Sequence, residues 1–332
     1  MQAAAPQRDL PLPVLREELQ LSRGAPTLTG KPAWLIFDPV QHRYFELDHE
    51  AFQILSLWNA HKTSASLIKA LDDEFGRTAD TQRIAGIISF LQQNTLVLDD
   101  GEGAWKKHWR NYQKRQVSPV TWLIHNYLYI RIPLLRPSRF LKAAFPYVAF
   151  VFTRTFALLT VLSALTGLFF VSREWDTFIS TFASFYSFEG IVFYGLVLVL
   201  IKIIHEMGHA FMATRFGCRV PTMGVAFLVM FPVLYTDVTD AWKLRSRRQR
   251  LLIGAAGMMA ELALASYATL AWVFLPDGTA KSIAFVVATI SWTMSIVINL
   301  NPLMRFDGYY LFSDATGIAN LQSRGFAFGK WK

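Results

Sequence analysis

The second half of the chain contains apolar stretches long enough to decide its fold class. Four of them, at about 150–172, 190–212, 251–275 and 282–300, carry few charged residues. A helix crosses the hydrocarbon core of a bilayer with about 20 apolar residues, because each residue adds about 1.5 Å to its length. The sequence therefore predicts a mainly α-helical, polytopic membrane core over residues 148–332, and it excludes a wholly soluble protein.

The first third of the chain has the mixed composition of a soluble domain. Residues 1–29 contain four prolines and no continuous apolar run, which predicts a mobile arm and no cleavable export signal. Residues 33–37 and 43–47 are rich in aromatic and aliphatic residues, as strands are, and 96–98 predict a further strand. Between them, apolar residues recur at helical spacing in three segments. We therefore expect a small cytosolic α+β domain.

This order of strands, helices and a closing strand over residues 30–100 resembles the PqqD-like winged-helix fold. The segment from Tyr44 to Leu55 carries most of the likeness. The resemblance implies a domain that binds leader peptides, which add to the edge of its sheet through backbone hydrogen bonds. A winged helix that serves only as a structural cap or a protein contact is the alternative, because a fold alone does not determine function.

Residues 101–147 form a basic segment. Their Lys and Arg residues alternate with Trp122, Tyr127 and Tyr129. This mixture suits a membrane surface, where aromatic rings occupy the headgroup region and cations meet anionic lipid. The chain carries a formal net charge of +9, and its basic residues cluster beside apolar segments and not along one soluble face. The charge therefore indicates an interfacial linker with the lipid bilayer as its partner, and not a nucleic acid.

The connections between the predicted spans differ in their content of basic residues. Those at 173–189 and 276–281 contain one each, whereas 213–250 contains seven. Because cytoplasmic loops carry the excess of Lys and Arg, we expect 213–250 and the N-terminal domain on the cytosolic side of a bacterial-type inner cell membrane. Within this connection, residues 222–235 are apolar but too short to span, and Pro232 argues against a straight helix. They predict a re-entrant hairpin close to a site.

Three ionisable residues lie close together in the second predicted span. His205 and His209 are about one helical turn apart and share a face, so both imidazoles can bind one metal ion, and Glu206 is placed to accept a proton from water. Ionisable groups are costly inside a bilayer, and a divalent cation that they bind offsets the cost. The alternative is a hydrogen-bonded polar cluster without a metal. With Cys218 as the single cysteine, ligands must come from His and carboxylates.

A catalytic zinc ion usually has three protein ligands, so the two histidines require a third residue. The candidates are Asp237, Asp240, Glu261 and Asp307. The second and fourth predicted spans both end on the cytosolic side, which places Asp307 at the depth of the histidines. Three roles stay open for Glu261: a proton carrier, a partner of a histidine, or a hydrogen bond to a neighbouring helix. Lys202 is expected to pair with an acid or to extend toward the membrane surface.

Two motifs together resemble those of the site-2 protease family of intramembrane zinc metalloproteases. They are HEMGH, which begins at His205, and NxxPxxxxDG, which begins at Asn299. The resemblance implies that zinc is bound by His205, His209 and Asp307. It also implies that Glu206 is the general base and that Asn299 stabilises the oxyanion of a peptide bond under attack.

The stretches MFPVLYTDVTDAW and DGYYLFSD are similar to a subgroup of that family described as peptide zinc metalloproteases. In this subgroup the protease core is joined to a PqqD-like domain and to an export adaptor, which implies both a peptide or membrane-protein substrate and an export adaptor as partners. The chain departs from many members in its third span, where Pro and Asn are replaced in the run from Gly257 to Glu261. Relatives generally continue with further membrane segments, so this chain is expected to be a fragment.

Two functions from different classes follow. The first is a membrane-embedded zinc metalloendopeptidase that hydrolyses a membrane-associated or leader-bearing peptide. The alternative is a non-proteolytic membrane component of a peptide maturation or export system, in which the winged-helix domain binds the cargo. Glu206 favours the first, because a metal scaffold needs ligands but no general base. Zinc transport is a weaker third hypothesis, because one site does not make a pathway of successive sites.

Overall fold

The computed structural model describes most of the chain. The described residues are 9–26, 32–76, 80–98, 129–183, 188–228 and 231–317, together with 321–322, 325–326 and 329. The chain divides into two compact units. The first consists of residues up to Asn126 together with Trp242–Arg245, and the second contains the remaining residues.

The first unit contains a three-stranded antiparallel sheet. Its strands, in the order β1-β2-β3, are β1 (Gln20–Arg23), β2 (Trp34–Asp38) and β3 (Arg43–Leu47). Trp34 on the central strand pairs with Arg23 on one side and with Leu47 on the other. β2 and β3 confirm the two predicted strands, because aromatic and aliphatic residues fit a pleated, half-buried surface.

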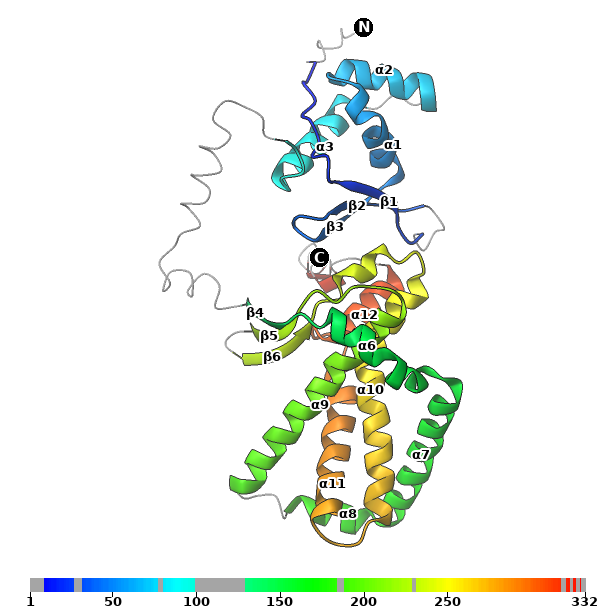
Figure 1. The fold of residues 1–332 in the computed structure, drawn as a ribbon, viewed down its shortest axis with the longest axis vertical. Coiled ribbons are helices and arrows are strands. Elements are labelled where there is room, and N and C mark those ends of the chain that lie inside the picture. The colour runs from blue at the N-terminus through cyan, green and yellow to red at the C-terminus, as the bar shows by residue number, and fades with distance from the viewer. Residues whose placement is uncertain are drawn as a thin grey trace. The chain divides into compact units, whose positions relative to one another are not determined.

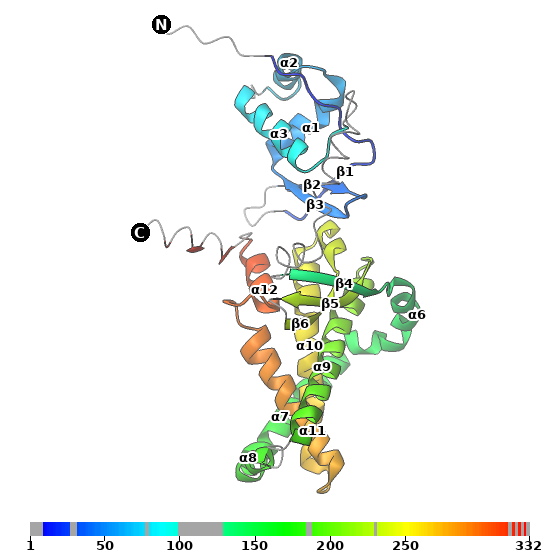
Figure 2. The same cartoon turned by 90° about the vertical axis from the view of Figure 1, so that its left-hand side faces the viewer.

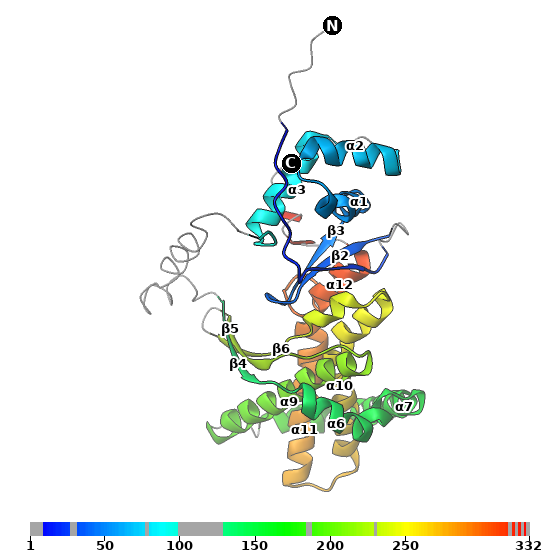
Figure 3. The same cartoon turned by 45° about the horizontal axis from the view of Figure 1, so that its top comes forward.

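Three helices lie on one side of this sheet (Figures 1 and 3). They are α1 (His49–Leu57), α2 (Ser64–Phe75) and α3 (Thr81–Gln93), and a 3-10 turn, η1 (Trp58–Ala60), follows α1. Each helix begins at a polar cap, because the side chains of Asp48, Thr63 and Asp80 accept hydrogen bonds from backbone N–H groups of the first turn. Their apolar faces meet in a core that includes the fully buried Trp58.

Residues 9–26 belong to this unit, which differs from the predicted mobile arm over 1–29. β1 adds a strand to the sheet, and the Arg16 guanidinium lies 3.0 Å from the carboxylate of the buried Asp38. Prolines suit an extended segment on a domain surface as well as a free tail, so composition did not separate the two.

The closing strand predicted at 96–98 is reduced to a single bridge in the structure. Val97 forms that bridge with Leu15, and no longer ladder continues from it among the described residues. The N-terminal segment provides the partner that this short apolar stretch needs. Sequence separation explains why the pairing was not expected, since strand partners far apart in the chain leave no local signal.

The second unit is built on four long helices (Figure 1). They are α7 (Arg154–Arg173), α9 (Phe188–Arg215), α10 (Arg247–Phe274) and α11 (Thr279–Trp292), the last continued by a π-helical segment, η4 (Thr293–Asn299). Counting α11 and η4 as one, all four are long and apolar enough to cross a membrane. They agree with the four predicted spans within a few residues at each end. The shorter helices are α6 (Ser138–Val148), η2 (Ala149–Phe152), α8 (Trp175–Ala183), η3 (Thr239–Lys243) and α12 (Asp307–Thr316).

The helices of this bundle are apolar on their outer faces as well as between them. α10 packs against α7, α9 and α11. On the outer faces of α7 and α9, large apolar side chains are exposed, among them Leu158, Leu162, Leu165, Leu196, Val199, Leu200 and Ile203. A helix that is apolar all round is expected where lipid and not water surrounds it. The second unit therefore has the construction of a membrane protein.

A second three-stranded antiparallel sheet lies at the end of the bundle near α12, and α8 lies at the opposite end (Figures 1 and 2). Its strands, in the order β4-β5-β6, are β4 (Tyr129–Leu135), β5 (Met223–Leu228) and β6 (Phe231–Thr236). β5 and β6 form a β-hairpin in the segment 222–235, for which a re-entrant membrane hairpin was predicted. Pro232 is tolerated because β6 is an edge strand. β6 also packs against α9.

β4 and α6 come from the segment predicted as an interfacial linker, 101–147. Regular structure was not expected there, because β4 is defined by its antiparallel pairing with β5, about 90 residues later in the chain. Residues 99–128, which include Trp122 and Tyr127, lie outside the described residues.

Candidate metal centre

α9 carries four polar residues on one face of an otherwise apolar helix. Lys202, His205, Glu206 and His209 follow the spacing i, i+3, i+4 and i+7, which places them along one stripe. His205 and His209 are buried, with exposures of 4% and 8%. The stripe faces α10, so the two imidazoles point into the bundle.

Asp307 lies beside the two histidines, although it is distant from them in the sequence. It is the first residue of α12 and follows His209 by 98 positions. Its Oδ2 atom lies 2.8 Å from Nε2 of His205 and 3.3 Å from Nε2 of His209, and the two Nε2 atoms are 3.1 Å apart. Among the described residues, these three offer ligand atoms close enough together to hold one metal ion.

The second ring nitrogen of each histidine faces a hydrogen-bond acceptor. Nδ1 of His209 lies 2.7 Å from the carbonyl oxygen of Ile253. Nδ1 of His205 lies 3.0 Å from Oε1 of Glu261, within ion-pair distance although off the line of an ideal hydrogen bond. With Nδ1 carrying the proton on both rings, each Nε2 has its lone pair directed at the other and at Asp307.

In this tautomer three acceptor atoms converge on one point, and they repel one another unless a positive charge lies between them. In a tetrahedral zinc site with ligand distances of about 2.0–2.1 Å, neighbouring ligand atoms are roughly 3.3 Å apart. The separations of 2.8, 3.1 and 3.3 Å are close to this value. The arrangement fits a three-ligand zinc site, and each histidine has the oriented outer partner that such ligands usually have.

Asp307 also has the charge that a metal ligand needs. Burial raises the pKa of Asp307, but the two histidine side chains beside its carboxylate lower it by more, so its pKa lies below the usual range. Its position depends on Gly308, because a Cβ there would come within 2.6 Å of backbone atoms of Asn299 and Leu300. The glycine lets the first turn of α12 approach the end of η4 and brings Asp307 to the histidines.

Gly257 on α10 leaves the space beside the two imidazoles open. A Cβ at this position would lie 2.4 Å from Nε2 of His209 and 2.5 Å from Nε2 of His205. It would therefore occupy the volume onto which both metal-facing nitrogens are directed. The sequence showed that Gly257 begins the run in which the Pro and Asn of many family members are replaced, but not that the residue faces the histidines.

We expect Gly257→Ala to abolish high-affinity metal binding, because the added methyl group enters the space between the two Nε2 atoms. Zinc per chain, measured by elemental analysis of the purified protein, should fall from about one to a small fraction of one. Gly254→Ala is the matched control: its Cβ would meet nothing closer than 3.7 Å, so this variant should keep its metal. Full zinc in Gly257→Ala would contradict this geometry.

Glu261 is fully buried on α10 and has four polar neighbours. Its Oε1 lies 2.7 Å from Nζ of Lys202 and 3.0 Å from Nδ1 of His205. Its Oε2 accepts hydrogen bonds from Oγ of Ser295 at 2.7 Å and from Nδ2 of Asn299 at 2.9 Å. Of the roles left open for Glu261, contact with a histidine and with neighbouring helices is realised, and Lys202 pairs with an acid. Ser295 carried no signal in the sequence.

The remaining predicted residues occupy separate positions. Asp237 caps the turn that leads into η3 by accepting from Thr239, and Asp240 accepts from the backbone N–H of Arg219 at 2.9 Å, so neither is a ligand of this site. Glu206 is next to His205 on α9, and its backbone carbonyl accepts from Thr236 on β6. The structure thus places the edge strand of the sheet beside the glutamate.

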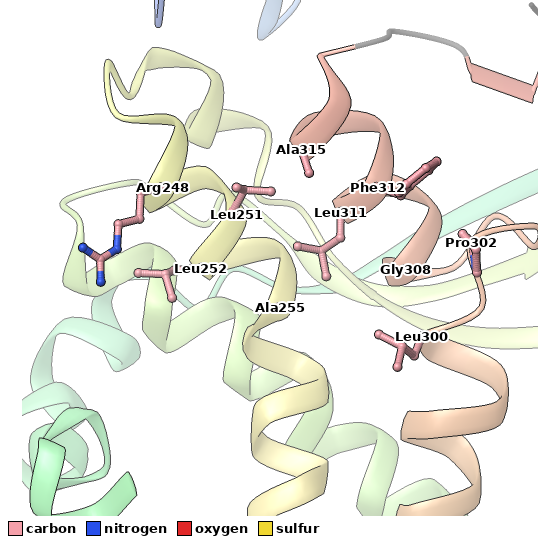
Figure 4. Close-up of a pocket in the computed structure, with 10 residues that line it drawn as sticks. All are labelled: Arg248, Leu251, Leu252, Ala255, Leu300, Pro302, Gly308, Leu311, Phe312 and Ala315. Carbon is pink, nitrogen blue, oxygen red and sulfur yellow. The ribbon is translucent and has the colours of Figure 1, made fainter. Parts of the chain in front are cut away.

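An open apolar groove of about 500 Å³ runs between α10 and α12 beside this centre. Figure 4 shows Leu251, Leu252 and Ala255 on one side and Leu311 and Ala315 on the other. Its remaining lining residues are Arg248, Leu300, Pro302, Gly308 and Phe312. Because Leu300 and Gly308 are sequence neighbours of Asn299 and Asp307, the groove adjoins the ends of both site segments.

Comparison with known proteins gives one match. Residues 193–281 match the family model described as Peptidase family M50. The match covers about a quarter of the chain and includes His205, Glu206, His209 and Glu261, but it ends before Asp307. No curated protein and no solved structure matches the chain. In the segment that carries the two histidines, the chain is thus similar to a family of peptidases.

Proposed function

We propose that the protein is a membrane-embedded zinc metalloendopeptidase of the site-2 protease type. One observation carries the proposal: three acceptor atoms from His205, His209 and Asp307 converge, and Glu206 stands beside the first of them. A metal ion explains the convergence, and a general base next to it is what peptide hydrolysis requires. The match to Peptidase family M50 supports the reaction class.

Each residue of the proposed site has its own role in the hydrolysis of the peptide bond. His205, His209 and Asp307 would hold a zinc ion, which would polarise the peptide carbonyl and lower the pKa of water at the site. Glu206 accepts the proton of the attacking water and passes it to the leaving amine. Asn299 donates one N–H bond to Glu261, and the second N–H bond of its amide stabilises the developing oxyanion.

The substrate proposed is a peptide or membrane protein with apolar residues beside the cleaved bond. The groove between α10 and α12 supports this, because its lining is apolar and it adjoins Asp307. Apolar side chains gain free energy by leaving water for such a groove. A helical substrate must unwind locally to be cleaved, since its backbone amides are otherwise bonded within the helix.

We further propose that the first unit lies on the cytosolic side of a bacterial-type inner membrane and binds a leader peptide or another part of the substrate. The excess of basic residues in 213–250 supports this orientation. The three-stranded sheet of the first unit supports the mode of binding, because its edge strands β1 and β3 offer backbone groups for strand addition. An export adaptor is the further partner proposed.

Removal of the metal tests the proposed function. We expect the purified protein in detergent to cleave members of a library of quenched fluorogenic peptides with apolar cores, to lose this activity with a zinc chelator, and to regain it with added zinc. In water enriched in oxygen-18, one heavy oxygen should enter each new carboxyl terminus, since hydrolysis takes its oxygen from water. Cleavage that continues unchanged after the metal is removed would contradict the proposal.

A further inference from the structure

We propose that Glu261 is a positioning residue that prepares the metal centre from α10. The inference rests on the proposed function, because it concerns the residues that would hold the ion. Glu261 is not in contact with Asp307 or with the point on which the ligands converge. It acts through His205 and Asn299, which it contacts by different oxygen atoms.

The carboxylate of Glu261 has four polar neighbours. Lys202 donates a hydrogen bond to Oε1, and Ser295 and Asn299 donate to Oε2. Nδ1 of His205 lies at ion-pair distance from Oε1. Two of these neighbours come from α9 and two from η4. The carboxylate thus joins α9 and η4 to α10 at the level of the site.

Lys202 supplies the compensating positive charge at 2.7 Å, which offsets the cost of a carboxylate with no exposed surface. The lysine side chain keeps 26% exposure, so its charge is partly hydrated while its partner is buried.

The consequence for His205 is an oriented ring. With a metal ion at Nε2, the Glu261 carboxylate 3.0 Å from Nδ1 keeps the ring proton on that nitrogen. The ring of His209 is oriented in the same way by the backbone carbonyl of Ile253, whose oxygen lies 2.7 Å from Nδ1. One ligand is therefore oriented by the main chain, which no substitution removes, and the other by a side chain that a substitution can remove.

Asn299 is held by the same carboxylate. A charge-assisted hydrogen bond to Oε2 at 2.9 Å fixes which end of its amide faces α10. Glu261 therefore links the ligand on α9 to the amide at the end of η4. Loss of the carboxylate should disturb both, whereas loss of a polar contact elsewhere between α10 and the fourth span should disturb neither.

The test is the affinity of the purified protein for zinc alone, measured by competition with a coloured chelator. Glu261→Gln keeps an oxygen for Lys202 and His205 but loses the charge, so we expect an affinity about threefold to tenfold weaker. Glu261→Leu removes the acceptor, and we expect a loss of about tenfold to a hundredfold. Cobalt in place of zinc should show an altered visible spectrum in both variants.

Thr269→Val is the matched control. Thr269 is a buried polar residue of α10 that accepts a hydrogen bond from Nε1 of Trp292 at 3.0 Å, away from the site. This variant should lose thermal stability but keep wild-type zinc affinity and the wild-type cobalt spectrum. Wild-type zinc affinity in Glu261→Gln would overturn the proposal even if Glu261→Leu does not fold. A wild-type protein that binds zinc but cleaves no peptide would contradict the proposed function and leave this inference standing.

Discussion

Glu206→Gln should abolish peptide cleavage while the protein still binds one zinc ion. The amide cannot accept the proton of the attacking water, so we expect a rate loss of about 10²-fold to 10⁴-fold, typical of removing a general base. The metal should stay, because Glu206 is not among the three ligands (His205, His209 and Asp307). The measurement is the initial rate on a cleaved peptide, together with zinc per chain.

Glu189→Gln is the control for this substitution. Glu189 lies in the first turn of the same helix, α9, and its exposed side chain is far along the helix from the site. It should cleave at the wild-type rate. Wild-type activity in Glu206→Gln would contradict the protease proposal, and the non-proteolytic role in peptide maturation or export would then be the better explanation of the metal.

Asp307→Ala should lose the metal itself. Two imidazoles alone are too few for a protein zinc site of normal affinity, so we expect zinc to fall from about one per chain to well below 0.1. His205→Ala should behave in the same way. Elemental analysis after gel filtration measures the loss, and the circular dichroism spectrum shows that the helices remain.

Asp314→Asn separates this effect from a general disturbance of α12. Asp314 is a carboxylate of the same helix, 3.4 Å from Arg250 and outside the ligand group. This variant should keep its zinc. A full complement of zinc in Asp307→Ala would show that the third ligand is another residue, and the geometry at the start of α12 would then need a different explanation.

The four long helices were predictable because the bilayer restricts what can cross it. A spanning segment must satisfy its own backbone hydrogen bonds and expose apolar side chains, so it appears in the sequence as a continuous apolar run. The pair His205 and His209 was predictable for a similar reason. Both lie within one helix, and the spacing i, i+4 places them on one face wherever that helix packs.

The third ligand was not determined by local pattern. Four carboxylates were candidates for the third ligand. Asp307 was favoured among them only because the assumed orientation of the spans placed it at the depth of the histidines. The structure separates them by contacts between elements: Asp240 caps a backbone N–H group, Glu261 holds a histidine from outside, and Asp307 reaches the centre. Residues 98 positions apart leave no periodic signal that joins them.

The strand pairings in the two sheets, including that of the N-terminal segment, were also not predictable where the partners are distant in sequence. β5 and β6 are neighbours in sequence and were anticipated as a hairpin, whereas β4 pairs with β5 across about 90 residues of the chain. β1 likewise joins a sheet from a segment whose prolines suggested a free tail. Strand pairing depends on backbone groups that every residue carries, so distant partners cannot be recognised from side-chain pattern alone.

The sequence by itself determined the membrane helices, the two histidines and the glutamate beside them, because each of these depends on residues within a few turns of one helix. Only the tertiary structure decided which carboxylate lies with the two histidines, why Gly257 leaves no room for a side chain, and which four polar groups surround Glu261. These depend on where α9, α10, η4 and the start of α12 approach one another. Such approaches are set by packing between helices, and that packing is not contained in any one of them.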